Sequence, residues 1–157
     1  MNALRFVLGL MLSVASASAF SQAGAPSGCE SLQAVPTSYR GGFEGIYADI
    51  IVQRCNGCHI GDDQGGFNMD VDFAYGNVLQ PSSTGAGLFR VKPRDPLNSF
   101  LFRKINCSNP GLGERMPRLP INGIYLSVSE QARIYDWIAS GAPFEQIFAD
   151  GIGEARR

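Results

Sequence analysis

The sequence has little of several features that mark large classes of protein. It has one histidine among 157 residues, so no site in this chain can combine two imidazoles. Its 13 Lys and Arg nearly balance its 14 Asp and Glu, which gives no indication of nucleic-acid binding. No nucleophile, acid–base pair or phosphate-binding loop indicates substrate turnover, and we therefore do not expect an enzyme.

Regular alternation of polar and apolar residues, the pattern of a half-buried strand, is also missing, as are internal repeats. Apolar residues recur instead at helical spacing in several segments. The sequence therefore predicts an all-α fold of about three to five helices with long loops.

The only long apolar run lies at the N-terminus. Arg5 precedes the run Phe6–Val14, and the small residues Ala17-Ser18-Ala19 follow it. This order is typical of a secretory signal peptide, residues 1–19, cleaved after Ala19. No later segment has the uninterrupted apolar length of a transmembrane helix. We therefore expect a periplasmic protein without a membrane span.

The remaining chain divides into three parts. Residues 20–42 are rich in Ala, Ser, Gly and Pro without an apolar period, which predicts a linker or tether. Residues 43–145 contain the periodic segments and form the predicted domain. Residues 146–157 are assigned to a C-terminal tail.

Two helices are predicted in the first half of the domain. Five apolar residues recur at helical spacing and lead directly into Cys55: Phe43, Ile46, Tyr47, Ile50 and Ile51. A shorter helix is expected within residues 70–80, with Phe73, Val78 and Leu79 as its apolar residues, although Gly76 disfavours it.

Two more helices are predicted in the second half. One has Asp95 as its cap, Pro96 at its first position, and an inner face formed by Leu97, Phe100, Leu101 and Ile105. The other begins with a capping box of Ser127 and Glu130 and ends before Gly141, with a buried side formed by Ile134, Trp137 and Ile138. Residues 106–126 are expected to form an irregular loop.

The strongest chemical signal is the pentapeptide Cys55-Asn56-Gly57-Cys58-His59. Two thiols at this spacing can bond both vinyl groups of one porphyrin, and the adjacent imidazole then lies over the iron. We therefore predict one covalent haem c, attached through Cys55 and Cys58, with His59 as the proximal iron ligand.

Two other kinds of site use the same residue types. A thiol redox pair would follow a strand in a βαβ unit, whereas a helical pattern precedes Cys55. A zinc site needs four ligands, and the other candidates, Cys29, Cys107 and carboxylates, lack paired spacing. Both alternatives fit the sequence less well than a haem.

The second iron ligand cannot be a histidine of this chain. Methionine is the next ligand expected for a c-type haem. Met69 follows His59 closely and is better placed to pack beside a haem. Met116 lies farther along, in a loop stiffened by Pro117 and Pro120. We predict Met116 as the distal ligand, and the alternative is an ordinary gap-filling methionine.

Cys29 and Cys107 remain after haem attachment, an even number in an oxidising compartment. A disulfide between them would tie the linker back onto the domain. Free thiols and a link to a partner protein are the alternatives.

Charge is distributed unevenly along the chain. Six acidic residues and one basic residue lie between Glu44 and Asp72, whereas seven basic and two acidic residues lie between Arg90 and Arg118, around Met116. These cations would neutralise haem propionates or face an acidic redox partner, unless they form only a solvated surface.

Several ordered pieces of the chain resemble the class I cytochromes c: RCNGCH, GGFNMD, KPRDPLNSFLFRKI, RMP and LSVSEQARIYDWIASGAP. The resemblance covers residues 43–143 and is to bacterial single-haem domains, found as carriers or fused to dehydrogenases. It implies a cytochrome c-like fold, with helices wrapped around the haem and with His59 and Met116 on the iron. It also implies that Trp137 packs in a last helix that crosses the first, and that a proline carbonyl orients His59.

The chain departs from that family at two places. Tyr47 and Ile51 stand where the first helix usually has a Gly and aromatic pair, which puts the details of the helix crossing in doubt. Phe67 and Met69 stand where relatives usually have leucines, which favours Met69 as a core residue.

These inferences predict outer-sphere electron transfer, in which the iron changes oxidation state while both axial ligands stay bound. The expected partners are redox proteins that dock through a small interface, such as a periplasmic dehydrogenase or a terminal oxidase. The chain would act alone or as the electron-accepting subunit of a dehydrogenase. The alternative is a haem-based sensor or peroxidatic protein with a displaceable sixth ligand.

Overall fold

The computed structural model describes residues 25–36, 41–85, 87–118 and 124–145, which are helical and contain isolated bridge pairs but no strand. The elements in chain order are α1 (Phe43–Ile46), the π-helix η1 (Tyr47–Ile51), α2 (Val52–Arg54), α3 (Ala74–Val78), the 3₁₀-helix η2 (Pro96–Asn98), α4 (Phe100–Asn106) and α5 (Val128–Ala139). The all-α prediction is therefore confirmed for this part of the chain. The predicted signal peptide and C-terminal tail lie outside it. In the described segments, every helix is too short or too polar to cross a membrane.

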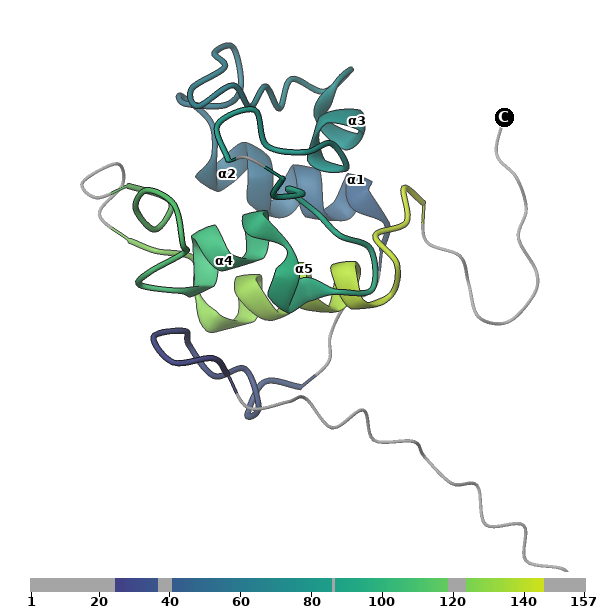
Figure 1. Cartoon of the computed structure of the whole chain (residues 1–157). Coiled ribbons are helices and arrows are strands. Elements are labelled where there is room, and N and C mark those ends of the chain that lie inside the picture. Colours follow the sequence, from purple (N-terminus) through teal and green to yellow (C-terminus); the bar gives the residue numbers. More distant parts are fainter. Residues whose placement is uncertain (1–24, 37–40, 86, 119–123, 146–157) are drawn as a thin grey trace, which may run out of the picture.

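The segments α1, η1 and α2 form one continuous helix that leads into Cys55 (Figure 1). Its predicted apolar stripe is confirmed, because Phe43, Ile46, Ile50 and Ile51 are all buried and Tyr47 is half-buried. The middle of this helix has the wider π geometry, for which the sequence gives no signal.

Helix α5 begins and ends where its local signals predict. The Ser127 hydroxyl accepts a hydrogen bond from the Glu130 amide at 3.2 Å, and the Glu130 carboxylate accepts one from the Ser127 amide at 2.7 Å. The helix packs against α4 and crosses α1, where the Trp137 ring lies 5.5 Å from that of Phe43. Trp137 is fully buried at this crossing.

The start of α1 is held by the chain that follows α5. The Phe43 amide lies 3.0 Å from the Pro143 carbonyl and 2.7 Å from that of Phe144, and donates to both. Gly42 lies so close to the Phe144 carbonyl that a Cβ atom there would clash with it. This close approach requires a glycine at position 42.

The helix predicted from Asp95 is interrupted. A 3₁₀ turn and α4 are separated at Ser99, whose backbone is extended. The amides of Phe100 and Leu101 donate to the carbonyls of residues 89 and 90, so the first turn of α4 bonds to a neighbouring segment. Asp95 does not cap the helix, because its carboxylate binds Asn98 and pairs with Lys92 at 2.9 Å.

Two predicted apolar faces also need correction. In α4 the most buried aromatic side chain is Phe102, which the prediction left out, while Leu97 and Leu101 are half-buried. Before α3, Phe73 is 60% exposed, because it precedes the helix and lies outside its buried side. The buried side of α3 is formed by Ala74 and Val78 instead.

The described part of the predicted linker, residues 25–36, lies against the domain beneath α4 and α5 (Figure 1). Leu32 is buried there and belongs to the main hydrophobic core. Cys29 forms a disulfide with Cys107, directly after α4. This segment is therefore part of the folded unit.

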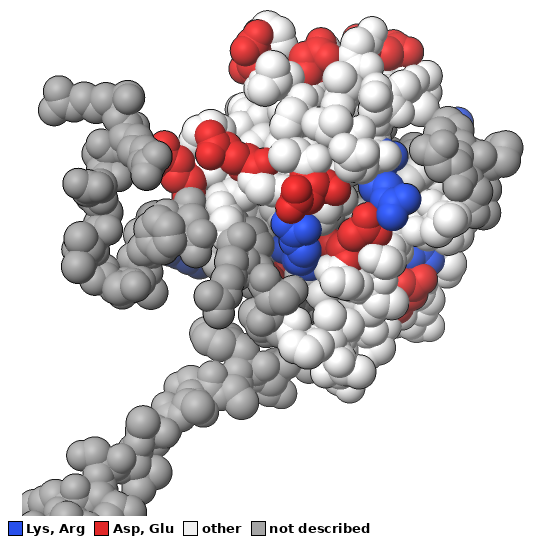
Figure 2. Space-filling model, turned by 180° about the vertical axis from the view of Figure 1, so that it is seen from behind, with Lys and Arg blue, Asp and Glu red and all other residues white. Residues whose placement is uncertain are grey.

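Charged side chains join the first helix to α5. Arg54 pairs with Glu130 at 2.8 Å, and Arg133 pairs with Asp49 at 2.7 Å. On the face shown in Figure 2, basic and acidic side chains alternate across the middle, and acidic side chains lie along the top. The middle of this face is therefore a mixed surface.

Candidate functional site

The pentapeptide forms a turn that continues directly from α2. The Cys55 amide donates to the Ile51 carbonyl at 2.8 Å, and the His59 amide donates to the Cys55 carbonyl at 3.1 Å. Gly57 has a φ of 85°, which a residue with a side chain rarely adopts. Cys55 and Cys58 are both unpaired and partly exposed. The turn thus presents two free thiols beside His59.

The environment of Cys55 does not suit a redox thiol. Burial, aided by the neighbouring Cys58, raises the pKa of the Cys55 thiol to about 12. Thiols that react by exchange need a lowered pKa, because the thiolate is the nucleophile. The raised pKa therefore disfavours the Cys55 thiolate that exchange chemistry needs.

The arrangement also does not suit a zinc site. Cys29 and Cys107 are joined to each other, so neither is free to complete a site with the pentapeptide. Among the described residues, no group of three or more His, Cys, Asp or Glu side chains is placed to hold a metal ion.

His59 is oriented by a main-chain carbonyl. Its Nδ1 lies 2.9 Å from the Phe67 carbonyl oxygen, which can only accept, so Nδ1 donates the hydrogen bond. Burial is the main cause that lowers the pKa of His59, which favours the neutral ring. Nε2 then keeps its lone pair, as a metal ligand must. The acceptor is Phe67 and not a proline, which corrects the expectation from the resemblance.

The loop that supplies this carbonyl is tied to His59 at a second point. Gly65 and Gly66 have φ values of 70° and 67°, which turn the chain back toward the pentapeptide. The Met69 amide then donates to the His59 carbonyl at 2.6 Å. The ring of Phe67 lies 5.3 Å from the imidazole.

Two cavities, of about 350 and 440 Å³, lie at this turn. Both fall in the size range of small-molecule and cofactor sites. His59 and Met116 line both of them, together with Gln64, Gly65 and Arg118. The first cavity also has apolar walls from Phe67, Phe100, Leu101, Ile105 and Leu112. The second contains Cys55 and Cys58.

The two methionines have different environments. Met69 is 1% exposed, belongs to the hydrophobic core and lines neither cavity. Met116 is half-buried and lines both. Of the two, only Met116 is placed to reach a molecule that also touches His59.

Lys104 of α4 holds the loop that carries Met116. The Met116 amide donates to the Lys104 carbonyl at 2.6 Å. The Lys104 ammonium donates to the carbonyls of Leu112 and Glu114, at 3.0 and 2.6 Å. Three backbone groups of the loop, those of Leu112, Glu114 and Met116, therefore bond to Lys104.

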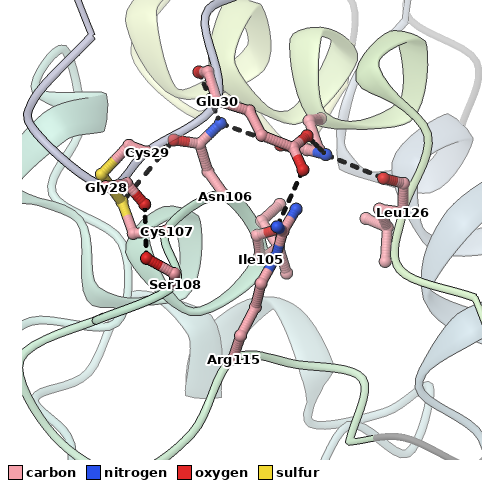
Figure 3. A network of polar contacts seen from close by, with 10 residues as sticks. Gly28, Cys29, Glu30, Ile105, Asn106, Cys107, Ser108, Arg115 and Leu126 are labelled. Carbon is pink, nitrogen blue, oxygen red and sulfur yellow. Dashed lines mark hydrogen bonds and ion pairs between the residues drawn. A yellow bond between two sulfur atoms is a disulfide. The ribbon is translucent and has the colours of Figure 1, made fainter.

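Arg115 ties the same loop to the N-terminal segment (Figure 3). Its Nε donates to the Ile105 carbonyl at 3.0 Å, and its Nη1 pairs with Glu30 at 2.8 Å. Glu30 also accepts a hydrogen bond from Gln131 of α5 at 2.6 Å. Glu30 follows Cys29, so the disulfide and the ion pair anchor the same short segment beside Met116.

Sequence reasoning missed the residues that support the site. The Phe67 carbonyl has no residue-type signal, and only the preceding Gly65-Gly66 pair marks a turn there. Lys104 and Arg115 belong to the predicted basic segment, but their hydrogen bonds depend on how the loop folds back on α4. Comparison of the chain with protein-family models, with curated proteins and with solved structures finds no match.

Proposed function

We propose that this chain is an exported electron-transfer protein with one covalent haem c, in a cytochrome c-like fold. In this proposal Cys55 and Cys58 would hold the haem through thioether bonds, and His59 and Met116 would bind its iron. The observation that carries it is that His59 and Met116 line the same two cavities, one of which also contains both free thiols.

A bound haem supplies an iron that changes between ferrous and ferric states. The chain's own residues keep it in place and set its environment. Thioethers from Cys55 and Cys58 would prevent its loss after export. The hydrogen bond to Phe67 holds the His59 imidazole in one orientation and would raise its basicity as a ligand. The apolar walls of the first cavity lower the local dielectric, which disfavours the more charged ferric site.

Cations at the cavities suit the carboxylates of a porphyrin. Arg90, Lys104 and Arg118 line the first cavity, and Arg54 and Arg118 line the second. Charge-assisted hydrogen bonds between such cations and carboxylates are about twice as strong as neutral ones. The cavity linings therefore combine apolar walls with cations, which suits a largely apolar ligand with negative groups at its edge. In the described structure these cations bond to carbonyls or carboxylates of the chain itself, so no one of them is assigned to a propionate.

Absorption spectra test the proposed ligands. The wild type and Met116→Ala are made in a host with the haem maturation machinery. Spectra of each are recorded as isolated, after reduction, and after addition of carbon monoxide to the reduced protein. Met69→Leu is the matched control, because it replaces the other methionine with a side chain of similar volume. We expect carbon monoxide to bind the ferrous Met116→Ala protein but not the wild type or the control.

Two other results would count against the proposal. If the wild type binds carbon monoxide as readily as Met116→Ala, Met116 is not a firm ligand and the sensor or peroxidatic function is the better account. If the wild type has no haem spectrum, the proposed function is wrong.

A further inference from the structure

Arg90 is a buried cation for which the described residues offer no acidic partner. It is 8% exposed, and none of the ion pairs among these residues includes it. Burying a guanidinium without a counter-charge is costly unless its donors are used well. Its N–H donors must therefore be satisfied by other hydrogen-bond acceptors of the protein.

The Arg90 side chain bonds to and stacks on the loop of Gly66 and Phe67, which contacts His59. Its Nη2 donates to the Gly66 carbonyl at 2.6 Å, and its Cζ lies 4.8 Å from the centroid of the Phe67 ring. Its Nη1 donates to the Asn77 carbonyl at 3.2 Å, in α3. A planar guanidinium can make two directed hydrogen bonds and stack on a ring at once, which a lysine cannot.

The position of Arg90 is itself fixed by the main chain. Its amide donates to the Gln80 carbonyl at 3.2 Å, and its carbonyl accepts from the Leu101 amide of α4 at 2.8 Å. Arg90 is thus a bonded link from α3 and α4 to Gly66. Gly66 directly precedes Phe67, whose carbonyl accepts the hydrogen bond from His59 Nδ1 at 2.9 Å.

We propose that Arg90 is a positioning residue for His59: by holding Gly66 and Phe67, it keeps the Phe67 carbonyl in place as the acceptor for the imidazole. This inference rests on the proposed function, in which His59 binds iron. Arg90 acts through the loop and needs no contact with His59. The loop carbonyl, and not the imidazole, is what Arg90 fixes.

Hydrogen exchange of the His59 Nδ1 proton tests the inference. The proton is followed by NMR in the reduced protein for the wild type, Arg90→Lys and Arg90→Met, with Arg94→Met as the control because Arg94 is an exposed neighbour. We expect exchange to accelerate about tenfold in Arg90→Met, the factor that corresponds to loss of one ordinary hydrogen bond. Arg90→Lys should give a smaller acceleration, and Arg94→Met none.

A purely structural role would give a different result. The amide of Ile138 in α5 lies in the core and reports on global opening. If it accelerates as much as the His59 proton, or if Arg90→Met exchanges like Arg94→Met, the inference is wrong. Where Arg90→Met does not fold, Arg90→Lys gives the same comparison.

The proposed function is judged separately, from the wild-type absorption spectrum alone. A wild type without haem refutes that function whatever Arg90 does. A wild type that carries haem, together with equal exchange in Arg90→Met and Arg94→Met, refutes the role of Arg90 alone.

Discussion

At the scale of single residues, the candidate site depends on main-chain carbonyls more than on pairs of side chains. His59 is held by the carbonyl of Phe67, and the Met116 amide is held by the carbonyl of Lys104. Cations bond to backbone close to both: Arg90 donates to the Gly66 carbonyl next to Phe67, and the Lys104 ammonium donates to the carbonyls of Leu112 and Glu114, just before Met116. In both loops a buried or half-buried cation therefore bonds to backbone near a proposed iron ligand.

Replacing Lys104 should loosen the loop around Met116. Lys104→Met keeps the length of the side chain but removes its hydrogen bonds to the carbonyls of Leu112 and Glu114. We expect a loss of about 1–2 kcal/mol in the free energy of unfolding, since each such bond contributes about 1 kcal/mol. Carbon monoxide should also bind the ferrous Lys104→Met protein measurably, whereas we expect no binding to the wild type.

Chemical denaturation and stopped-flow absorption measure these two effects. Lys92→Met is the control, because Lys92 is exposed and its one ion pair among the described residues is with Asp95. Equal carbon monoxide binding in the two variants would show that Lys104 does not position Met116.

The Glu30–Arg115 pair should make part of the stability depend on pH. The hydrogen bond from Arg115 is the main cause that lowers the pKa of Glu30 below its ordinary value of 4.5. A carboxyl whose pKa is lowered by folding stabilises the protein fully above the unfolded pKa, and this stabilisation is lost as the pH falls through the folded pKa. The loss should therefore occur below pH 4.5.

Glu30→Gln should remove this component of the pH dependence. The Glu30 side chain is 39% exposed, so solvent screening limits the effect to at most about 1 kcal/mol. Unfolding measured between pH 7 and pH 3 should show a smaller loss of stability for the variant than for the wild type. Glu114→Gln, at an exposed ion pair, is the control. Parallel curves for wild type and Glu30→Gln would contradict the prediction.

At the scale of helices and loops, two glycines near the start of α1 should respond in opposite ways to the same substitution. A Cβ at Gly42 would clash with the backbone of residues 144 and 145, whereas a Cβ at Gly45 has no neighbour within 4 Å. Gly42→Ala should lower the free energy of unfolding by about 1–3 kcal/mol, the usual cost of overpacking. Gly45→Ala should raise it by about 0.5–1 kcal/mol, because alanine is the better helix former.

Thermal or chemical unfolding of the two single variants is sufficient to compare them. A neutral Gly42→Ala would show that α1 does not need the close approach to the chain after α5.

Elements with purely local signals were predictable from the sequence. The capping box of Ser127 and Glu130 involves neighbouring residues only, so the start of α5 follows from the sequence itself. The same holds for the buried stripe that begins at Phe43. The break at Ser99 was not predictable, because the amides after it bond to residues 89 and 90, a segment that only the tertiary fold brings there.

The residues of the candidate site could be proposed from the sequence, but the contacts that support them could not. Cys55, Cys58 and His59 are adjacent in sequence, and Met116 followed from the ligand preferences of haem iron. The supporting contacts join residues far apart in the chain, as when Arg90 bonds to Gly66, and they use carbonyls that every residue has. No residue type marks such an acceptor.

At the scale of the whole molecule, the N-terminal segment is tied to the domain by covalent and non-covalent contacts. The disulfide joins Cys29 to Cys107, which are 78 residues apart, and Leu32 is buried in the core. A cross-link that closes a loop of this length stabilises mainly by restricting the unfolded chain. We therefore expect it to contribute to stability and to keep Glu30 beside Arg115.

Replacing both cysteines should lower the free energy of unfolding. For Cys29→Ser with Cys107→Ser we expect a loss of up to about 4 kcal/mol in the chain-entropy model. The visible spectrum of the haem should persist in the variant, because Cys55 and Cys58 are unchanged. A variant that unfolds at the same denaturant concentration as the wild type would contradict the first expectation, and one that loses its haem while folded would contradict the second.

The covalent haem is the central claim, and the intact mass of the exported protein under denaturing conditions tests it most directly. The wild type and the double variant Cys55→Ser, Cys58→Ser are both made in a host with the haem maturation machinery. We predict that the wild-type mass exceeds that of its polypeptide by one haem, and that the double variant has the mass of its polypeptide alone. A wild-type mass without this addition would contradict the account, because Cys55 and Cys58 would then be free thiols or a disulfide.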